Sequence, residues 1–181
     1  MLTRLAAALW LIALPTIAIP SAAEPSIEYE IKAAFLFNVA KFVQWPDSAF
    51  ASTDEPLIFC VIGQNPFGDS LERAFHGRTV QGRRLALRTG VTASAREDCH
   101  LAFFSGDPGD LYAEAARPAS ASTPRPLLTI GATEAFAEQG GMIRLGVEDG
   151  RLRFDVNEAA AAAAGLKISS QLLKLARHVE R

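Results

Sequence analysis

The sequence predicts an α/β protein in which a mostly parallel central sheet is flanked by helices, as in a Rossmann-like layered sandwich. Two observations support this fold class. Short apolar runs that end in glycine or turn residues recur along the chain, and helix-forming stretches lie between several of them. Because parallel strands need a crossover connection, strands that alternate with helices favour a parallel sheet.

The N-terminal 23 residues have the layout of a secretory signal peptide. A basic residue, Arg4, precedes an apolar run over residues 5–19, and small residues follow up to Ala23. The alternative is an uncleaved membrane anchor, which needs about 20 continuous apolar residues. This run is shorter and contains Pro15. We therefore expect cleavage after Ala23, one domain over residues 24–181, and no membrane insertion after cleavage.

The charge balance argues against a polyanionic partner. The chain has 18 Lys+Arg and 20 Asp+Glu, and loss of Arg4 with the signal leaves 17 against 20, a balance of −3. Nucleic-acid binders usually carry a clustered basic face. Here the basic residues are scattered, apart from the short stretch GRRLALR at residues 82–88. We expect no nucleic-acid partner.

A helix is predicted in EIKAAFLFNVAKFVQWP, residues 30–46. At 100° per residue, its apolar positions cover one broad arc that suits packing on a sheet. These positions are Ile31, Phe35, Leu36, Val39, Phe42 and Val43.

The opposite, polar arc of this helix also holds Phe37, Lys41 and Trp45, spaced i, i+4 and i+8. Two aromatic rings with a cation between them on a polar face are typical of a contact surface. The alternative is that a neighbouring loop folds over both rings. Phe37, Lys41 and Trp45 are the candidate partner-binding residues.

Six apolar runs after this helix are predicted strands, because they are short and end in turn residues. They cover residues 56–63, 83–88, 100–105, 126–131, 142–147 and 151–156. Asp149-Gly150 is a tight-turn signal, so the last two strands are expected to form an antiparallel hairpin.

Short helices are predicted between several of these strands. Asp69 or Ser70 can cap one that ends at Gly77, and two others cover residues 110–116 and 133–139. The proline- and serine-rich stretch at 116–126 is predicted to be an exposed loop.

The C-terminal region is predicted to be helical in two pieces. Asn157 can cap an alanine-rich helix that Gly165 ends. Ser169 or Ser170 can cap a second helix with an apolar side. That side consists of Leu172, Leu173, Ala176 and Val179.

The sequence offers little catalytic apparatus. GxSxG is absent, and His76, His100 and His178 have no nucleophile at a recognisable spacing. No CxxC motif or Cys/His cluster is present, so we expect no metal site and no cofactor. GQNPFG at residues 63–68 lacks the Lys-Ser or Lys-Thr of a phosphate loop and contains Pro66, so a strand-to-helix turn is expected there. We expect no enzymatic activity.

Cys60 and Cys99 are the two cysteines of the chain. In an exported protein they are expected to be joined if the fold brings their Cα atoms within about 7 Å. The strands at 56–63 and 100–105 would allow this if they are neighbours, as the first and third strands of doubly wound sheets often are.

Several motifs together resemble the YfiR family of periplasmic regulators over almost the whole mature chain. They are IKAAFLFNVAKFVQWP, FCVIGQNPFGDSL, GRTVQGRRLALR, CHLAFF, PLLTIG, FAEQGGMIRL and RLRFDVNEAAAAAAGLKISSQLLKLA, in this order. The resemblance implies a periplasmic α/β sandwich that holds the sensor domain of an inner-membrane diguanylate cyclase inactive, which lowers cyclic di-GMP and restrains biofilm formation.

The same resemblance implies homodimers, no enzymatic activity and matching positions for Cys60 and Cys99. Some relatives carry a second cysteine pair in the region of residues 127–141, which this sequence lacks, so redox behaviour attached to that pair does not carry over. The alternative function is a periplasmic small-molecule sensor, because loops at the carboxyl ends of parallel strands are where such sheets bind ligands.

Overall fold

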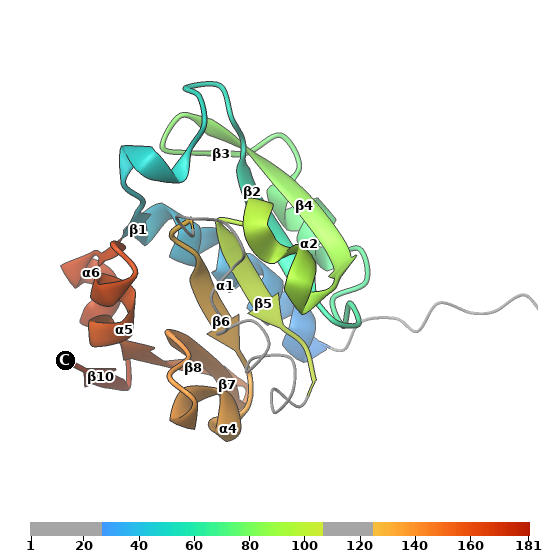
Figure 1. Cartoon of the computed structure of the whole chain (residues 1–181). Helices are drawn as coiled ribbons and strands as arrows, with labels where there is room; N and C mark the ends of the chain where they lie inside the picture. Colours follow the sequence, from blue (N-terminus) through green and yellow to red (C-terminus); the bar gives the residue numbers. More distant parts are fainter. Residues whose placement is uncertain (1–26, 107–124) are drawn as a thin grey trace, which may run out of the picture.

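The structure is a computed structural model that describes residues 27–106 and 125–181 (Figure 1). Three predicted features lie outside the described residues: the signal peptide at 1–23, the helix at 110–116, and all but the end of the loop at 116–126.

Eight strands form one sheet, and all six predicted strands belong to it. The strands are β2 (Leu57–Ile62), β3 (Thr79–Val80), β4 (Arg83–Val91), β5 (Leu101–Phe104), β6 (Leu128–Gly131), β7 (Ile143–Glu148), β8 (Arg151–Asn157) and β10 (His178–Glu180). Their order across the sheet is β10-β8-β7-β6-β5-β2-β4-β3. All neighbouring pairs are parallel except β3–β4 and β7–β8. The predicted α/β class, the mostly parallel sheet and the C-terminal hairpin are confirmed.

Strand β2 lies inside the sheet and is buried on both faces, which explains its unbroken apolar sequence. Its side chains alternate between two cores, since successive residues of a strand point to opposite faces. Leu57, Phe59 and Val61 enter the larger core. Ile58, Cys60 and Ile62 enter a smaller core on the other face.

The helices are short except for the first. Within residues 27–106 and 125–181 they are α1 (Ile27–Phe42), α2 (Ser70–Phe75), α4 (Glu134–Glu138), α5 (Glu158–Ala163) and α6 (Ser170–Leu173), with two 3₁₀ turns, η1 (Asp47–Ala49) and η2 (Ala93–Asp98). Asn157 and Ser169 cap α5 and α6 through their side-chain oxygens, as predicted.

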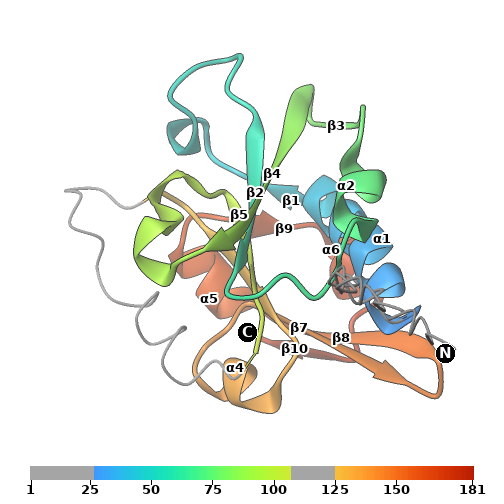
Figure 2. The ribbon, with the colours of Figure 1, turned by 90° about the vertical axis from the view of Figure 1, so that its right-hand side faces the viewer.

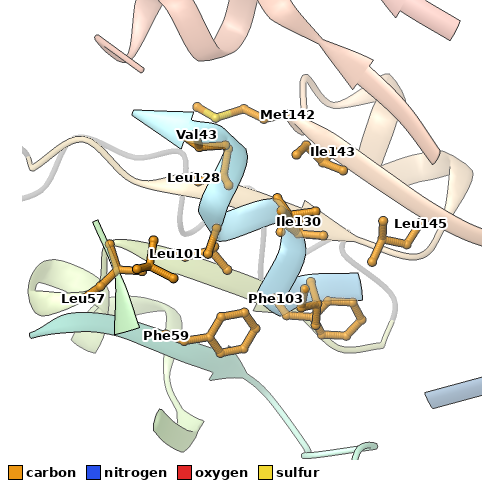
Figure 3. Packing of buried hydrophobic residues seen from close by; sticks show 14 of the residues in the cluster. Val43, Leu57, Phe59, Leu101, Phe103, Leu128, Ile130, Met142, Ile143 and Leu145 are labelled. Atoms are coloured by element: carbon orange, nitrogen blue, oxygen red, sulfur yellow. The ribbon is translucent and has the colours of Figure 1, made fainter. Parts of the chain in front are cut away.

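Helix α1 covers one face of the sheet, and the larger core fills the space between them. Figure 3 shows Phe59, Leu101, Ile130 and Leu145, from four neighbouring strands, gathered beneath this helix. Leu36 and Val39 of α1 are fully buried in the same core, while Phe35 is half-buried against Phe154 at 4.9 Å between ring centroids.

The smaller core contains a close fit between two glycines and an aromatic ring. A Cβ added to Gly131 would lie 2.4 Å from the Phe136 ring, and one added to Gly141 would lie 2.1 Å from it. Such distances are too short for any pair of non-bonded carbons, so both positions require glycine because Phe136 of α4 fills the space.

A second, two-stranded sheet joins distant parts of the chain. Strand β1 (Val43–Gln44) follows α1 directly and pairs antiparallel with β9 (Lys167–Ile168), which lies between α5 and α6 (Figure 2). The C-terminal region is thereby held against the end of α1.

The predicted second C-terminal helix is largely wrong. Helix α6 ends at Leu173, and His178–Glu180 forms strand β10, which pairs in parallel with β8. The exposed edge of β8 offers backbone hydrogen bonds that a longer helix would leave unused. Ion pairs of Arg177 with Asp155 (2.7 Å) and Glu148 (2.5 Å) hold the chain at this edge.

The disulfide between Cys60 and Cys99 is present, with 5.9 Å between the Cα atoms. Strands β2 and β5 are parallel neighbours, and Cys99 lies two residues before the start of β5, so the predicted adjacency of the two strands is confirmed. The bridge lies in the smaller core, and both cysteines are buried.

Candidate partner-binding surface

The candidate surface lies where α1 ends. The helix stops at Phe42, whose carbonyl oxygen accepts a hydrogen bond from the Ser169 backbone N–H at 2.8 Å. The chain is then extended, because β1 pairs with β9 and because the residue before a proline, here Trp45, disfavours the helical conformation. The helical spacing that joined Trp45 to Phe37 and Lys41 therefore does not apply beyond Phe42.

Trp45 is not part of an exposed stripe. Its side chain is 7% exposed and belongs to the larger core. Its indole Nε1 donates a hydrogen bond to the backbone oxygen of His100 at 3.1 Å. The expectation that Trp45 faces solvent was wrong, and Pro46, its neighbour in the sequence, is the signal that indicates the end of the helix.

Phe37 and Lys41 do share the outer side of α1. Lys41 is exposed, and its Nζ lies 5.6 Å from the centroid of the half-buried Phe37 ring. The guanidinium carbon of Arg78, which follows α2, lies 4.6 Å from the same ring. Phe37 thus contacts two cations. The sequence pattern of α1 gives no sign of Arg78, because that residue is distant in the chain.

A shallow depression adjoins this pair of residues. It is lined by Lys41, Phe42, Gln44, Trp45, Gln81, Ser169 and Gln171. Gln81 lies in the turn between β3 and β4 with a positive φ of 52°, and its side-chain nitrogen donates to the Val43 oxygen at 2.6 Å. Three separate segments therefore build the depression, and most of its lining side chains are polar.

Beneath the depression, His100 is completely buried. Its Nδ1 accepts a hydrogen bond from the Ile58 N–H at 3.2 Å, so Nδ1 carries no proton. The proton is on Nε2, which donates to the Ala49 oxygen at 3.0 Å. Burial lowers the pKa of His100, outweighing the Ala49 hydrogen bond and the Glu55 charge, which favour the protonated form.

The segment of residues 46–55 folds over His100. The Phe50 ring stacks on the imidazole with 4.5 Å between centroids and an interplanar angle of 18°. The guanidinium carbon of Arg83, from β4, lies over the Phe50 ring, 3.6 Å from its centroid. Its Nη1 also donates to the backbone oxygens of Ser52, Thr53 and Glu55 at 2.8–3.0 Å.

Glu55 makes two further contacts that hold this segment in place. Its carboxylate pairs with Arg125 at 2.5 Å and accepts a hydrogen bond from the Ala51 N–H. Although burial would raise the pKa of Glu55, these interactions outweigh it and lower the pKa.

The other features with possible chemistry have structural roles. GQNPFG forms a strand-to-helix turn, as predicted: Asn65 accepts from the Phe67 N–H at 3.0 Å, and the Phe67 ring is buried against Phe103.

Within residues 27–106 and 125–181, no three His, Cys, Asp or Glu side chains are grouped to bind a metal. No helix in these two ranges has the length and apolarity needed to cross a bilayer.

Comparisons with known proteins agree with the fold. A family model described as YfiR/HmsC-like matches residues 29–177. A solved structure, described as a conserved domain protein from Vibrio cholerae O1 biovar El Tor str. N16961, is similar with a TM-score of 0.52 and 14% identity. The match covers 84% of this chain and 60% of that one, so the chain spans less than two thirds of that protein's length. No curated protein matches the sequence at a significant level.

Proposed function

The chain belongs to the YfiR/HmsC-like family, and from this we propose that it is a periplasmic regulator of an inner-membrane diguanylate cyclase. The regulator binds the periplasmic sensor domain of the cyclase and holds it inactive, which lowers cyclic di-GMP and biofilm formation. The observation that carries this proposal is the family match over residues 29–177. The chain acts by binding and not as an enzyme.

We assign the contact with the cyclase to Phe37 and Lys41 at the outer side of α1. Aromatic side chains and arginine are enriched at protein interfaces, and here the Phe37 ring lies beside Arg78. Phe37 is already oriented by Lys41 and Arg78, so little conformational freedom is lost when a partner covers it. The polar rim of the adjoining depression, including Gln44 and Gln81, supplies hydrogen-bonding groups around this centre.

Repression by binding sets an energetic requirement. The regulator can shift the cyclase only by as much as it prefers the inactive form over the active one. Each tenfold preference corresponds to about 1.4 kcal/mol. Loss of one aromatic contact at the centre of the interface is therefore enough to change repression measurably.

The proposal is tested by deleting the gene and measuring cyclic di-GMP. We expect the level to rise, and expression of the parent protein to restore it. A chain carrying Phe37→Ala and Lys41→Glu should accumulate normally but fail to restore it. If deletion leaves cyclic di-GMP unchanged, the regulatory function is refuted. If the double variant represses like the parent, the contact lies elsewhere.

A second copy of this chain, in the homodimer that the family resemblance implies, is the other candidate occupant of this surface. Sedimentation of the purified parent and of the Phe37→Ala, Lys41→Glu variant separates the two roles. A variant that loses self-association together with repression assigns the surface to the dimer. A variant that keeps its association state but loses cyclase binding assigns it to the cyclase.

We also propose export through the signal at residues 1–23. The mature protein recovered from a periplasmic extract should begin at Glu24, which intact mass would establish. A mass that includes Met1 would contradict cleavage.

A further inference from the structure

The neutral ring of His100 joins the 46–55 segment to the sheet. The ring acts as an acceptor toward the Ile58 N–H and as a donor toward the Ala49 oxygen, and Phe50 stacks on its face. These three contacts join the segment to β2 and to the start of β5. Arg83, Arg125 and the burial of Ala49 in the larger core also hold the segment, and the imidazole adds polar links from it to the buried strands.

We propose that His100 is an acid-sensitive latch, and that protonation of its ring releases the 46–55 segment from the sheet. A proton added to Nδ1 would point at the Ile58 N–H, so two donors would face each other across 3.2 Å. The ring would also carry a charge at a position with no solvent access. Neither problem is relieved unless the ring leaves its site.

The charged groups around the ring do not compensate for that charge. Glu55 of the segment favours the imidazolium, but Arg83 from β4 and Arg125 from the stretch before β6 disfavour it. Glu55 is itself paired with Arg125. The other carboxylates of the segment, Asp47 and Asp54, are exposed. The net environment is unfavourable for a buried cation, which agrees with the lowered pKa of His100.

Release of the segment would change the neighbouring surface. Trp45 immediately precedes the segment, lines the depression and donates to the His100 backbone oxygen. When residues 46–55 leave the sheet, the chain that follows Trp45 is no longer fixed, so the indole is no longer held against the His100 oxygen. Acid would thereby expose Trp45, whether or not the chain binds a cyclase.

Trp45 provides a direct measurement of this release. In a full chain carrying Trp10→Phe, Trp45 is the single tryptophan. As the pH falls below about 6.5, the ordinary pKa of histidine, we expect its emission to move reversibly to longer wavelength while far-ultraviolet circular dichroism is retained. Exchange of the Ile58 amide hydrogen should accelerate over the same range. If emission does not move until circular dichroism is also lost, the latch is refuted.

Two variants assign the transition to His100. His100→Gln keeps one donor and one acceptor but cannot be protonated, so its emission should be independent of pH over this range. Glu55→Gln removes a contact that holds the segment and the anion that favours the imidazolium in the closed state, so both effects should move the midpoint of release to higher pH. This second variant provides the test if His100→Gln does not fold. A transition that persists unchanged in His100→Gln, or a midpoint that Glu55→Gln does not shift, would overturn the assignment.

Discussion

The indole Nε1 of Trp45 donates a hydrogen bond to the backbone oxygen of His100 at 3.1 Å, which joins the end of the first helix to the start of strand β5. The same oxygen accepts a second hydrogen bond from the Leu128 N–H at 2.9 Å. Trp45 is therefore a structural residue that links three segments, although it also borders the candidate surface.

Replacement of Trp45 should lower stability. Trp45→Ala removes a large buried ring and is expected to reduce the free energy of unfolding by about 3–5 kcal/mol. Trp45→Phe loses chiefly one hydrogen bond, about 1 kcal/mol, because the His100 oxygen keeps its bond from Leu128. Urea unfolding followed by circular dichroism measures both values. A loss below about 1 kcal/mol for Trp45→Ala would mean that the indole is not packed in the core.

Phe37 and Lys41 should affect binding more than folding. We expect Phe37→Ala with Lys41→Glu to weaken binding to the cyclase's periplasmic domain at least about tenfold, or 1.4 kcal/mol. Titration calorimetry with the two purified proteins measures this change. Arg151→Glu is the matched control, because it reverses an exposed charge at the far hairpin. Equal weakening by the control would indicate a general charge effect.

The disulfide should contribute much of the stability. It closes a loop of 39 residues, for which the chain-entropy model gives roughly 4 kcal/mol. The variant with Cys60→Ala and Cys99→Ala should lose a stability of this size in chemical unfolding. Thiol labelling of the denatured, unreduced parent should find no free cysteine. Two labelled thiols per chain would refute the bridge.

Gly141 should tolerate no side chain, whereas Gly146 should. Gly141→Ala places a methyl group 2.1 Å from the Phe136 ring, so the ring must move, at a cost of about 1–3 kcal/mol. Gly146→Ala is the control, since a Cβ there meets nothing within 4 Å. Thermal unfolding of the two variants should differ clearly. Similar midpoints would mean that Phe136 can shift freely.

The Asp155 carboxylate should make the free energy of unfolding depend on pH in the acid range. Burial would raise its pKa, but hydrogen bonds from Arg177 and Arg144 outweigh burial and lower it. Between the lowered folded value and the ordinary one, the unfolded chain binds more protons, so stability falls as the pH decreases. The contribution is complete above the ordinary value of about 3.9.

Asp155→Asn tests this dependence. It should reduce stability at neutral pH by about 1.5–3 kcal/mol, as expected for hydrogen bonds to a charged group. It should also flatten the acid limb of the stability profile, while Asp149→Asn in the exposed turn leaves that limb unchanged. An unaltered acid limb in Asp155→Asn would contradict the role of the carboxylate.

Local sequence predicted the interior of the sheet well. The run Leu57–Ile62 is apolar at every position because both of its faces are covered, and this pattern needs no knowledge of its neighbours. The β7–β8 turn was equally readable, since Asp149 and Gly150 both adopt positive φ angles that this residue pair favours.

The C-terminal strand and the candidate surface were less predictable, because they depend on distant residues. Leu172–Arg177 has good helix propensity, yet Arg177 binds Asp155, a residue 22 positions away. Arg78 reaches Phe37 from beyond α2. The prediction that the helix extends to Trp45 was wrong for a local reason. Pro46 follows Trp45, and the residue before a proline disfavours the helical conformation.

The pairing of β1 with β9 also has a consequence for the order in which the molecule forms. Val43 lies opposite Ile168, so the floor of the depression is complete only after residues near the end of the chain have folded. Closing so long a loop is slow compared with forming local structure. A partly synthesised or partly translocated chain can form α1 but lacks the finished depression. Only the completely folded chain can therefore bind a partner through this surface.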